Sequence, residues 1–203
     1  KEVLEVGSGP GGNIEILLSM SPKKGSGADI SEEMIKISKS NPSNKNVDFV
    51  KIDGRNLPFE DNTFDIIYTV TVLQHIVADE MLHPLIASIC RVSRSDVMIF
   101  ERIEKQRNVS DTNVGRTVEE YQSLFQKQGF DLYKTEQLRI NISYFICGAI
   151  RRLFNKSDRQ EGEPQTKLAI WTQKILLPIT KILDPLFPMG RDLTLLHFKK
   201  IGS

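Results

Sequence analysis

The chain has 203 residues, of which 39% are hydrophobic and 26% are charged, which is enough apolar content for one domain with a substantial core. The formal net charge is +1, so no strong overall field attracts nucleic acid or a membrane. No apolar run reaches about 18 residues, no signal peptide is visible, and the two cysteines, Cys90 and Cys147, form no CxxC pair. We therefore expect a soluble, cytoplasmic protein with free core thiols.

The chain opens on a short apolar run that leads directly into glycines, Val3-Leu4-Glu5-Val6-Gly7-Ser8-Gly9-Pro10-Gly11-Gly12. A helix is predicted from about residue 13 to 20. Strand, glycine turn and helix form the layout in which a backbone approaches a nucleotide closely, because glycine permits positive φ and leaves room for a ligand. The spacing of Gly7, Gly9 and Gly12 also fits the dinucleotide fingerprint. Glu5 would crowd a pyrophosphate, and it favours a cationic ligand such as the ammonium and sulfonium of S-adenosylmethionine.

Two acids follow the next two predicted strands. Asp29 lies 22 positions after Gly7, where it can accept both ribose hydroxyls in a doubly wound sheet. Its alternative role is to cap the next helix, which Ser31 fills better. Asp53 ends the alternating stretch 47–53 and can accept a hydrogen bond from an exocyclic amine such as that of adenine. Its alternative role is to cap a turn.

The fourth predicted strand, residues 64–70, is mostly apolar, as a central parallel strand should be. Residues 71–76 follow at its carboxyl edge, where ligands bind in open α/β sheets. His75 lies in this segment, and histidine is the side chain most often used as a general base, so it is the candidate general base. The alternative interpretation is a histidine at the start of a helix, bonded to backbone near the cofactor.

The pattern beyond residue 76 alternates between helices and strands. We expect a helix over 81–93, a turn over 91–96, a strand over 97–101, a loop over 102–116, a helix from 118 to 128 capped by Thr117 and Glu120, and strands over 130–138 and 193–200.

These segments, in this order and spacing, resemble the class I S-adenosylmethionine-dependent methyltransferases, of the methyltransferase type 11 (UbiE-like) group. The resemblance covers residues 1–76 and rests on residues 4–11, Asp29, Asp53 with 57–59, Asn62 with Phe64 and Asp65, and 72–76. It implies an α/β fold with a doubly wound, mostly parallel seven-stranded sheet of order 3-2-1-4-5-7-6, whose last strand is antiparallel. The stretch 91–96 departs from the family, because the glycine usual in that turn is absent.

The same resemblance implies S-adenosyl-L-methionine as the cofactor and no metal. The glycine loop would surround the methionine part, Asp29 would hold the ribose, and Asp53 would hold the adenine amine. The implied cofactor-binding residues are Glu5, Gly7, Ser8, Gly9, Asp29, Ile30, Met34, Asp53, Gly54, Arg55 and Thr69. The predicted function is methyl transfer to an O, N or C atom of a small-molecule or lipid- or sugar-linked acceptor. Two alternatives stay open, an NAD-dependent oxidoreductase and a cofactor-binding but inactive interaction module.

Residues 140–190 separate the last two strands where a short connection would suffice, and a structureless loop of that length is uncommon. Apolar stripes predict helices over 142–154 and 167–183, with a polar stretch between them. We therefore expect a cofactor-binding domain of residues 1–139 plus 191–203, and a helical insertion of residues 140–190. The insertion would be a substrate lid or recognition element, a homodimer contact or a peripheral membrane element.

Charge is unevenly distributed along the chain. Residues 139–203 carry 11 Lys and Arg against 5 Asp and Glu. A basic C-terminal third can meet an anionic substrate or surface, and an ordinary solvated face is the alternative. We expect a small-molecule acceptor that is anionic or lipid-linked, and no nucleic acid, because the basic content is mild and the aromatics are sparse.

Overall fold

The computed structural model describes residues 1–155, 165–186 and 193–202. The chain divides into two compact units, one of Lys1–Glu136 with Thr194–Ser203 and one of Gln137–Leu193. Most of the polar stretch predicted between the two insertion helices, and the predicted return at residues 187–190, lie outside the described residues.

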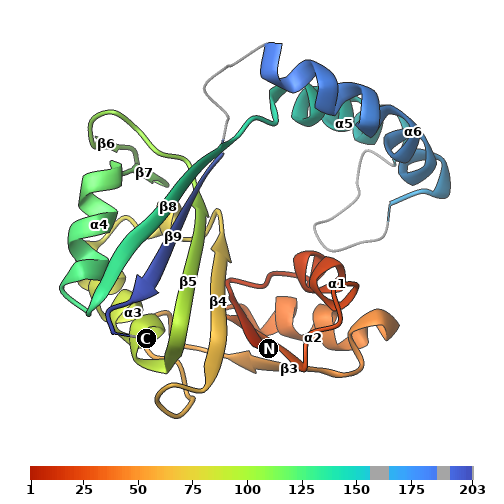
Figure 1. Ribbon diagram of the computed structural model, residues 1–203. Coiled ribbons are helices and arrows are strands. Elements are labelled where there is room, and N and C mark those ends of the chain that lie inside the picture. Colours follow the sequence, from red (N-terminus) through yellow and green to blue (C-terminus); the bar gives the residue numbers. More distant parts are fainter. Residues whose placement is uncertain (156–164, 187–192, 203) are drawn as a thin grey trace. The chain divides into compact units, whose positions relative to one another are not determined.

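A seven-stranded sheet of order β3-β2-β1-β4-β5-β9-β8 forms the centre of the first unit (Figure 1). Its strands are β1 (Glu2–Val6), β2 (Lys24–Asp29), β3 (Val47–Lys51), β4 (Phe64–Val70), β5 (Ser93–Glu101), β8 (Phe130–Leu138) and β9 (Leu193–Lys200). The pairings from β3 through β5 are parallel, and β9 is antiparallel to β5. The order confirms the predicted 3-2-1-4-5-7-6, since β8 and β9 are the sixth and seventh strands of the sheet in chain order.

Two of the four helices of this unit begin at a side-chain cap. The four are α1 (Gly12–Leu18), α2 (Glu32–Ser40), α3 (Asp79–Val92) and α4 (Val118–Gln126), with short 3-10 turns η1 (Pro42–Asn44) and η2 (Leu73–His75). Ser31 accepts a hydrogen bond from the Met34 N–H at the start of α2, and Thr117 and Glu120 form both bonds of a capping box at α4, as predicted. Gly129 follows α4 with φ of 78°, a conformation that suits glycine.

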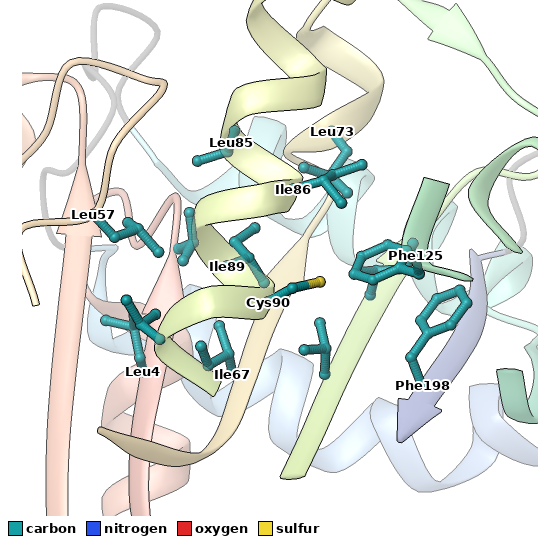
Figure 2. Packing of buried hydrophobic residues seen from close by; sticks show 14 of the residues in the cluster. Leu4, Leu57, Ile67, Leu73, Leu85, Ile86, Ile89, Cys90, Phe125 and Phe198 are labelled. Atoms are coloured by element: carbon teal, nitrogen blue, oxygen red, sulfur yellow. The ribbon is translucent and has the colours of Figure 1, made fainter. Parts of the chain in front are cut away.

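Apolar side chains are buried on both faces of the sheet. Successive residues of a strand point to opposite faces, and in β3 Phe49 belongs to one cluster while Val50 packs against the other. The smaller cluster joins α1, α2 and β3. The larger one joins α3, α4 and the strands from β1 to β9, and Figure 2 shows part of it. There the rings of Phe125 and Phe198 stack with centroids 4.1 Å apart. Helices on both faces define a doubly wound sheet.

The turn expected at residues 91–96 is replaced by a longer strand. Helix α3 ends at Val92 and β5 begins at Ser93 with no loop between them. Polar side chains fix this junction to β4, because the Ser95 hydroxyl donates to the Asp65 carbonyl and Arg94 pairs with the Asp65 carboxylate. The register shifts between Phe64 and Ile66, so a bulge takes the place of the missing glycine turn.

The segment expected to be a loop at residues 102–116 contains a small hairpin. Strands β6 (Asn108–Val109) and β7 (Val114–Gly115) pair in antiparallel fashion, and Ile103 bridges Arg116. Little in the amino-acid sequence indicates this hairpin, because each strand has only two residues and neither alternates over a useful length.

The second unit is a pair of helices that lie side by side, α5 (Asn141–Phe154) and α6 (Lys167–Leu183), followed by η3 (Asp184–Leu186). Polar groups join them: Ser143 donates to the Asp184 carboxylate from its N–H and its hydroxyl, and the hydroxyls of Ser143 and Thr180 are 2.8 Å apart. Among the described residues no helix has the length and apolar character needed to cross a bilayer.

Candidate active site

A cavity of about 520 Å³ lies at the carboxyl ends of the first four parallel strands, the edge at which open α/β sheets bind ligands. Five of the predicted cofactor-binding residues and the predicted base line it: Gly7, Asp29, Ile30, Asp53, Gly54 and His75. Apolar side chains make up most of the remaining wall, namely Val6, Ile52, Val72, Ile76, Val77, Ala78, Met81 and Leu85. Segments that are far apart in the sequence therefore converge on one chamber.

The glycine loop is held to β2 and α2 by hydrogen bonds. The Gly9 N–H donates to Asp29 Oδ2 at 2.8 Å, and the Gly9 carbonyl accepts from the Ser38 hydroxyl at 2.8 Å. Gly7 has φ of 77°, and a Cβ built on it would lie 2.3 Å from Val72 Cγ2. Only glycine fits this position without displacing the segment after β4.

The Asp29 carboxylate is mostly buried, and one backbone N–H donates to each of its oxygens. Gly9 donates to Oδ2, and Ser31 donates to Oδ1 at 2.8 Å. Each carboxylate oxygen has two lone pairs, so Asp29 keeps acceptor capacity toward the cavity that it lines. Ser31, and not Asp29, caps α2, so the predicted helix cap is confirmed, and the role of Asp29 toward a ribose stays a prediction.

Asp53 forms a turn with the next three residues of the chain. Its Oδ1 accepts from the N–H groups of Asn56 and Arg55 at 2.7 and 2.8 Å, and these bonds hold the pKa of the carboxyl below its usual range. The turn-capping alternative is thus present in the structure, at a position that also lines the cavity. The two roles coexist because Oδ2 accepts only one long bond, from the Asn56 side chain at 3.3 Å.

Glu5 differs from the other two acids, because it does not line the cavity. Its side chain is fully buried, and its oxygens accept hydrogen bonds from Asn13 Nδ2 at 2.9 Å and from the Tyr68 hydroxyl at 3.2 Å. Burial raises the pKa of Glu5 to about 7, against these two bonds, which lower it. Of the three acids predicted to bind one ligand, Asp29 and Asp53 therefore line the cavity and Glu5 does not.

The remaining predicted residues lie outside the cavity lining. The Ser8 hydroxyl is buried and has no hydrogen-bond partner among the described residues. Met34 lies in the first turn of α2, and Arg55 is exposed, with its Nε beside the Met81 sulfur. Thr69 is buried in β4 and donates to Glu101 at 3.3 Å. The roles assigned to these four residues, and to Gly9, which also lies outside the cavity lining, stay predictions.

Glu101, at the end of β5, was not predicted to belong to the site. Its fully buried carboxylate accepts from the backbone N–H groups of Val72, Leu73 and Gln74 at 2.9 to 3.2 Å. Burial raises the pKa of Glu101, and these N–H groups oppose the rise. Glu101 therefore satisfies the free N–H groups at the start of η2, the turn that carries His75 into the cavity wall.

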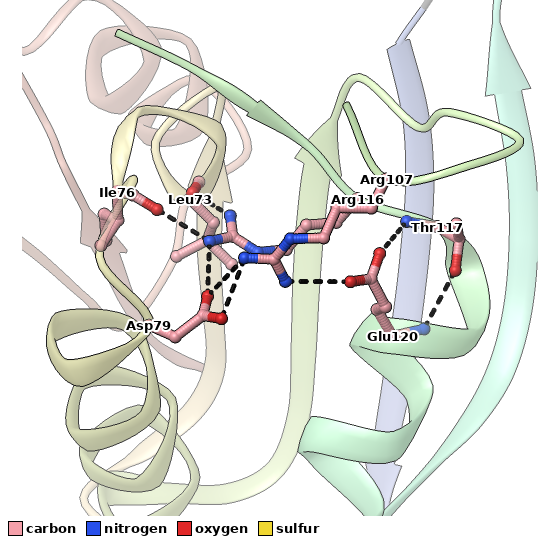
Figure 3. A network of polar contacts seen from close by, with 7 residues as sticks. All are labelled: Leu73, Ile76, Asp79, Arg107, Arg116, Thr117 and Glu120. Atoms are coloured by element: carbon pink, nitrogen blue, oxygen red, sulfur yellow. Dashed lines mark hydrogen bonds and ion pairs between the residues drawn. The ribbon is translucent and has the colours of Figure 1, made fainter. Parts of the chain in front are cut away.

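Arg116 holds the other end of the same turn, as Figure 3 shows. Its side chain is 1% exposed, and its guanidinium donates to the carbonyls of Leu73 and Ile76 at 2.9 and 2.8 Å, and to Asp79 at 3.2 Å. Burial would raise the pKa of Asp79, but hydrogen bonds from Arg107 and Arg116 lower it. A carboxylate and a guanidinium thus fix both ends of the segment that lines one side of the cavity.

The chain enters this segment through a strained residue. Thr71 has φ of 54°, which is rare for a β-branched side chain. Its N–H donates to the Phe100 carbonyl at 2.8 Å, and the bonds to Glu101 begin at the next residue. Strain of this kind persists only where the surroundings fix the backbone, and it is common at binding sites.

His75 lines the cavity and is exposed, with one ring nitrogen 3.3 Å from Gln74 Nε2. Its backbone N–H donates to the Val72 carbonyl. The imidazole ring therefore contacts the side-chain amide of Gln74. The alternative interpretation expected the histidine to bond to the backbone, and it is the main-chain N–H of His75, not the ring, that makes such a bond. No group of three or more His, Cys, Asp and Glu side chains suited to a metal gathers in the part of the chain that the structure describes.

Comparison with known proteins agrees with this geometry. Residues 3–96 match the family described as "Methyltransferase domain". The match and the strand order make the chain similar to class I, Rossmann-like methyltransferases. Over 71 residues the chain is 38% identical to a phthiotriol/phenolphthiotriol dimycocerosates methyltransferase of Mycobacterium tuberculosis, a match that covers 34% of this chain and 26% of the relative. The chain thus matches about a quarter of the length of the curated relatives.

Solved structures show the same fold at low sequence identity. Phosphoethanolamine N-methyltransferase 2 of Haemonchus contortus, in complex with S-adenosyl-L-methionine, has a TM-score of 0.66 at 17% identity, covering 100% of this chain and 49% of that one. The [4+2]-cyclase SpnF has a TM-score of 0.68 at 17% identity, covering 100% and 76%. At this sequence identity the likeness shows the fold alone. The two proteins that share this fold carry different names, one a methyltransferase and the other a cyclase.

Replacing Gly7 by alanine should reduce both stability and cofactor affinity. The added Cβ would clash with Val72, and the alanine would have to adopt a positive φ. We therefore expect a loss of about 1–3 kcal/mol in the free energy of unfolding. Gly12→Ala is the matched control, because no described atom lies within 4 Å of its Cβ. Urea unfolding and titration with S-adenosylhomocysteine measure both effects. Equal behaviour of the two variants would contradict the role assigned to Gly7.

Arg116 and Arg107 both pair with Asp79, but Arg116 is buried and the Arg107 side chain is 38% exposed. Arg116→Met removes the charged donor to the Leu73 and Ile76 carbonyls and a buried partner of Asp79, and should cost about 2–4 kcal/mol of unfolding free energy. Arg107→Met removes only exposed ion pairs and should cost under about 1 kcal/mol. Chemical denaturation compares them, and a larger loss in the Arg107 variant would overturn this account.

Glu5→Gln should stabilise the protein at alkaline pH. The folded-state pKa of about 7 exceeds the ordinary value of 4.5, so the wild type loses stability as pH rises from about 4.5 to 7. The advantage of the variant in unfolding free energy should therefore grow by about 2 kcal/mol between pH 5 and pH 8. Denaturant melts at the two pH values measure it. An advantage that does not change with pH would show that Glu5 is ionised in the fold at both.

Proposed function

We propose that the chain transfers the methyl group of S-adenosyl-L-methionine to a small or lipid-linked acceptor. One observation carries the proposal: the glycine loop, Asp29 and Asp53 converge on a single cavity at the carboxyl edge of the sheet. The family match over residues 3–96 adds to it. The match covers only about a quarter of the length of the relatives. The activity of the whole protein is therefore part of this proposal.

The residues of the cavity fit an adenosyl ligand. Asp29 has free lone pairs for two ribose hydroxyls, and Asp53 has a lightly used Oδ2 for an exocyclic amine. Gly54 has φ of 80°, and a Cβ there would lie 3.4 Å from Ile30 Cγ2, so its missing side chain leaves the wall open between Ile30 and Met81. Those apolar groups suit the faces of an aromatic base.

The chain contributes position and exclusion of water to the reaction, while the bound cofactor supplies a methyl group activated by its sulfonium. The glycine loop would surround the methionine part, with the buried Ser8 hydroxyl as a free hydrogen-bonding group. Where the acceptor carries a proton, His75 is the group at the cavity wall that can accept it. The bonds of Glu5 assign it to holding Asn13 and Tyr68, so the proposal does not need it as a ligand.

A lipid-linked acceptor is the class that the comparisons favour. The relatives that share 38% identity over 71 residues are named for phthiotriol and phenolphthiotriol dimycocerosates, which are lipids. The cavity wall toward the segment after β4 is apolar, with Val72, Ile76 and Val77, and such a wall tolerates an acyl chain close to the transferred methyl group. This supports a lipid-linked acceptor over a free sugar or a small acid.

Calorimetric titration with S-adenosylhomocysteine and with NAD tests the cofactor directly. We expect binding of the first and none of the second. Asp29→Ala and Asp53→Ala should each weaken binding of S-adenosylhomocysteine by about 1–3 kcal/mol, which is roughly 5- to 150-fold in Kd, because ligand groups lose their partners.

Asp48→Ala is the matched control, since Asp48 lies in β3 and forms an exposed ion pair with Lys24 outside the cavity lining. Its Kd should equal that of the wild type. Unchanged affinity in both the Asp29 and the Asp53 variants would remove the basis of the proposal, and binding of NAD alone would favour the oxidoreductase alternative.

A further inference from the structure

The second unit leaves most of its large apolar side chains uncovered. Of the eighteen exposed large hydrophobic residues in the described chain, twelve lie in this unit. Its buried apolar residues among those described are Ile150 and Ala169. A helix pair with so little core of its own and so much exposed apolar surface is an interaction surface rather than a simple connection.

Apart from Ile170 and Leu177, the exposed apolar residues of α6 and η3 form one stripe. They recur every three or four positions, which places them on a single face of the helix. The stripe consists of Leu168, Trp171, Ile175, Ile179, Ile182 and Leu186, all exposed, with Trp171 at 63% and Ile182 at 73%. Ala169 and Thr180, the buried residues of α6, lie on a different face, so the stripe is not the side that packs on α5.

Basic residues accompany this stripe. Lys167, Lys174 and Lys181 are exposed and recur every seven positions, so they form a second line beside the apolar one. Helix α5 adds exposed Arg151 and Arg152, and also exposes aromatic and aliphatic side chains, Tyr144, Phe145 and Leu153. Neither helix contains an Asp or a Glu. The charge of the pair is therefore entirely positive.

We propose that the α5–α6 pair docks on the surface of an anionic lipid bilayer, with the α6 stripe in the interface and the lysines toward the headgroups. An exposed apolar face bordered by Lys and Arg is the composition of helices that lie in that interface, and anionic lipids attract such cations. A tryptophan in the stripe fits the boundary between headgroups and acyl chains.

Charge argues against a second copy as the occupant. In a twofold contact the same face meets itself, so the five cations of one pair would approach those of the other without an acid of either helix between them. Like charges at close range oppose such a contact, whereas a bilayer of anionic lipid compensates all five. Docking on a bilayer goes beyond methyl transfer and does not depend on it.

The protein carries its own reporter, because Trp171 is its one tryptophan. Vesicles of phosphatidylcholine mixed with phosphatidylglycerol should shift the emission of Trp171 to shorter wavelength and protect it from acrylamide. Vesicles of phosphatidylcholine alone should give a much weaker effect. Flotation of the protein with the same vesicles measures the bound fraction.

Two variants separate the contributions of the stripe and of the charges. Ile175→Ser with Ile179→Ser should reduce vesicle binding at least tenfold. Lys167→Gln with Lys174→Gln and Lys181→Gln should also reduce it about tenfold or more, and only on anionic vesicles. Met20→Ser with Val109→Ser is the matched control, because both residues are exposed in the first unit. All variants should bind S-adenosylhomocysteine as the wild type does, which shows that the first unit is folded, and their circular dichroism should show the same helix content as the wild type.

The results that would overturn the proposal are distinct. Trp171 emission that is already blue-shifted and protected from acrylamide without vesicles would mean that the rest of the chain or a second copy covers the stripe, and sedimentation would tell these apart. Equal binding to neutral and anionic vesicles, or no binding to either, would also refute it. Failure of cofactor binding in the wild type would refute the proposed function and leave the vesicle result unaffected.

Discussion

The site depends on how η2 is fixed. This single turn carries His75 and leads directly into three further residues of the cavity wall, Ile76, Val77 and Ala78, and its backbone has free N–H groups at one end and free carbonyls at the other. Glu101 satisfies the N–H groups and Arg116 satisfies the carbonyls. Both side chains are buried, so their hydrogen bonds to the turn form at low dielectric, where such bonds are strong. The strained backbone of Thr71 is tolerated because these bonds fix the backbone of residues 72–76 directly after it.

The opposite wall is held differently, since side chains of the second βα unit, β2 and α2, bind backbone groups of the glycine loop. Asp29 joins the loop to the start of α2, and Ser38 joins it to the last turn of the same helix. Gly7 then contacts the chain after β4, because its missing Cβ is the space that Val72 fills. The two walls are therefore adjusted to each other before any ligand arrives, which reduces the ordering that binding would cost.

Much of this could be read from the amino-acid sequence, and the exceptions have physical reasons. The strand order, the caps at Ser31 and Thr117 and the positions of Asp29 and Asp53 depend on local patterns, so they were predictable. Glu101 and Arg116 were missed because their partners are backbone groups 27 to 43 residues away, and no local periodicity encodes such a contact. An acid that ends the apolar strand Val97-Met98-Ile99-Phe100 was the available signal. The burial of Glu5 and its bonds to Asn13 and Tyr68 appear only in three dimensions, so the sequence did not indicate them, and its predicted contact with the ligand stays a prediction.

The position of β9 in the sheet has a consequence for how the chain acquires its structure. β9 pairs with β5 across about a hundred residues, as Asp96 with Lys199 shows, and β8 lies beyond it at the edge of the sheet. During synthesis β5 consequently has an open edge until the whole α5–α6 segment has left the ribosome, and that segment exposes many apolar side chains. Unpaired strand edges and exposed apolar surface are the features that promote aggregation of nascent chains. Pairing of β9 with β5 is thus a late step between distant segments. Chaperones, or a surface that covers the apolar side chains of α5 and α6, would matter most before this pairing forms.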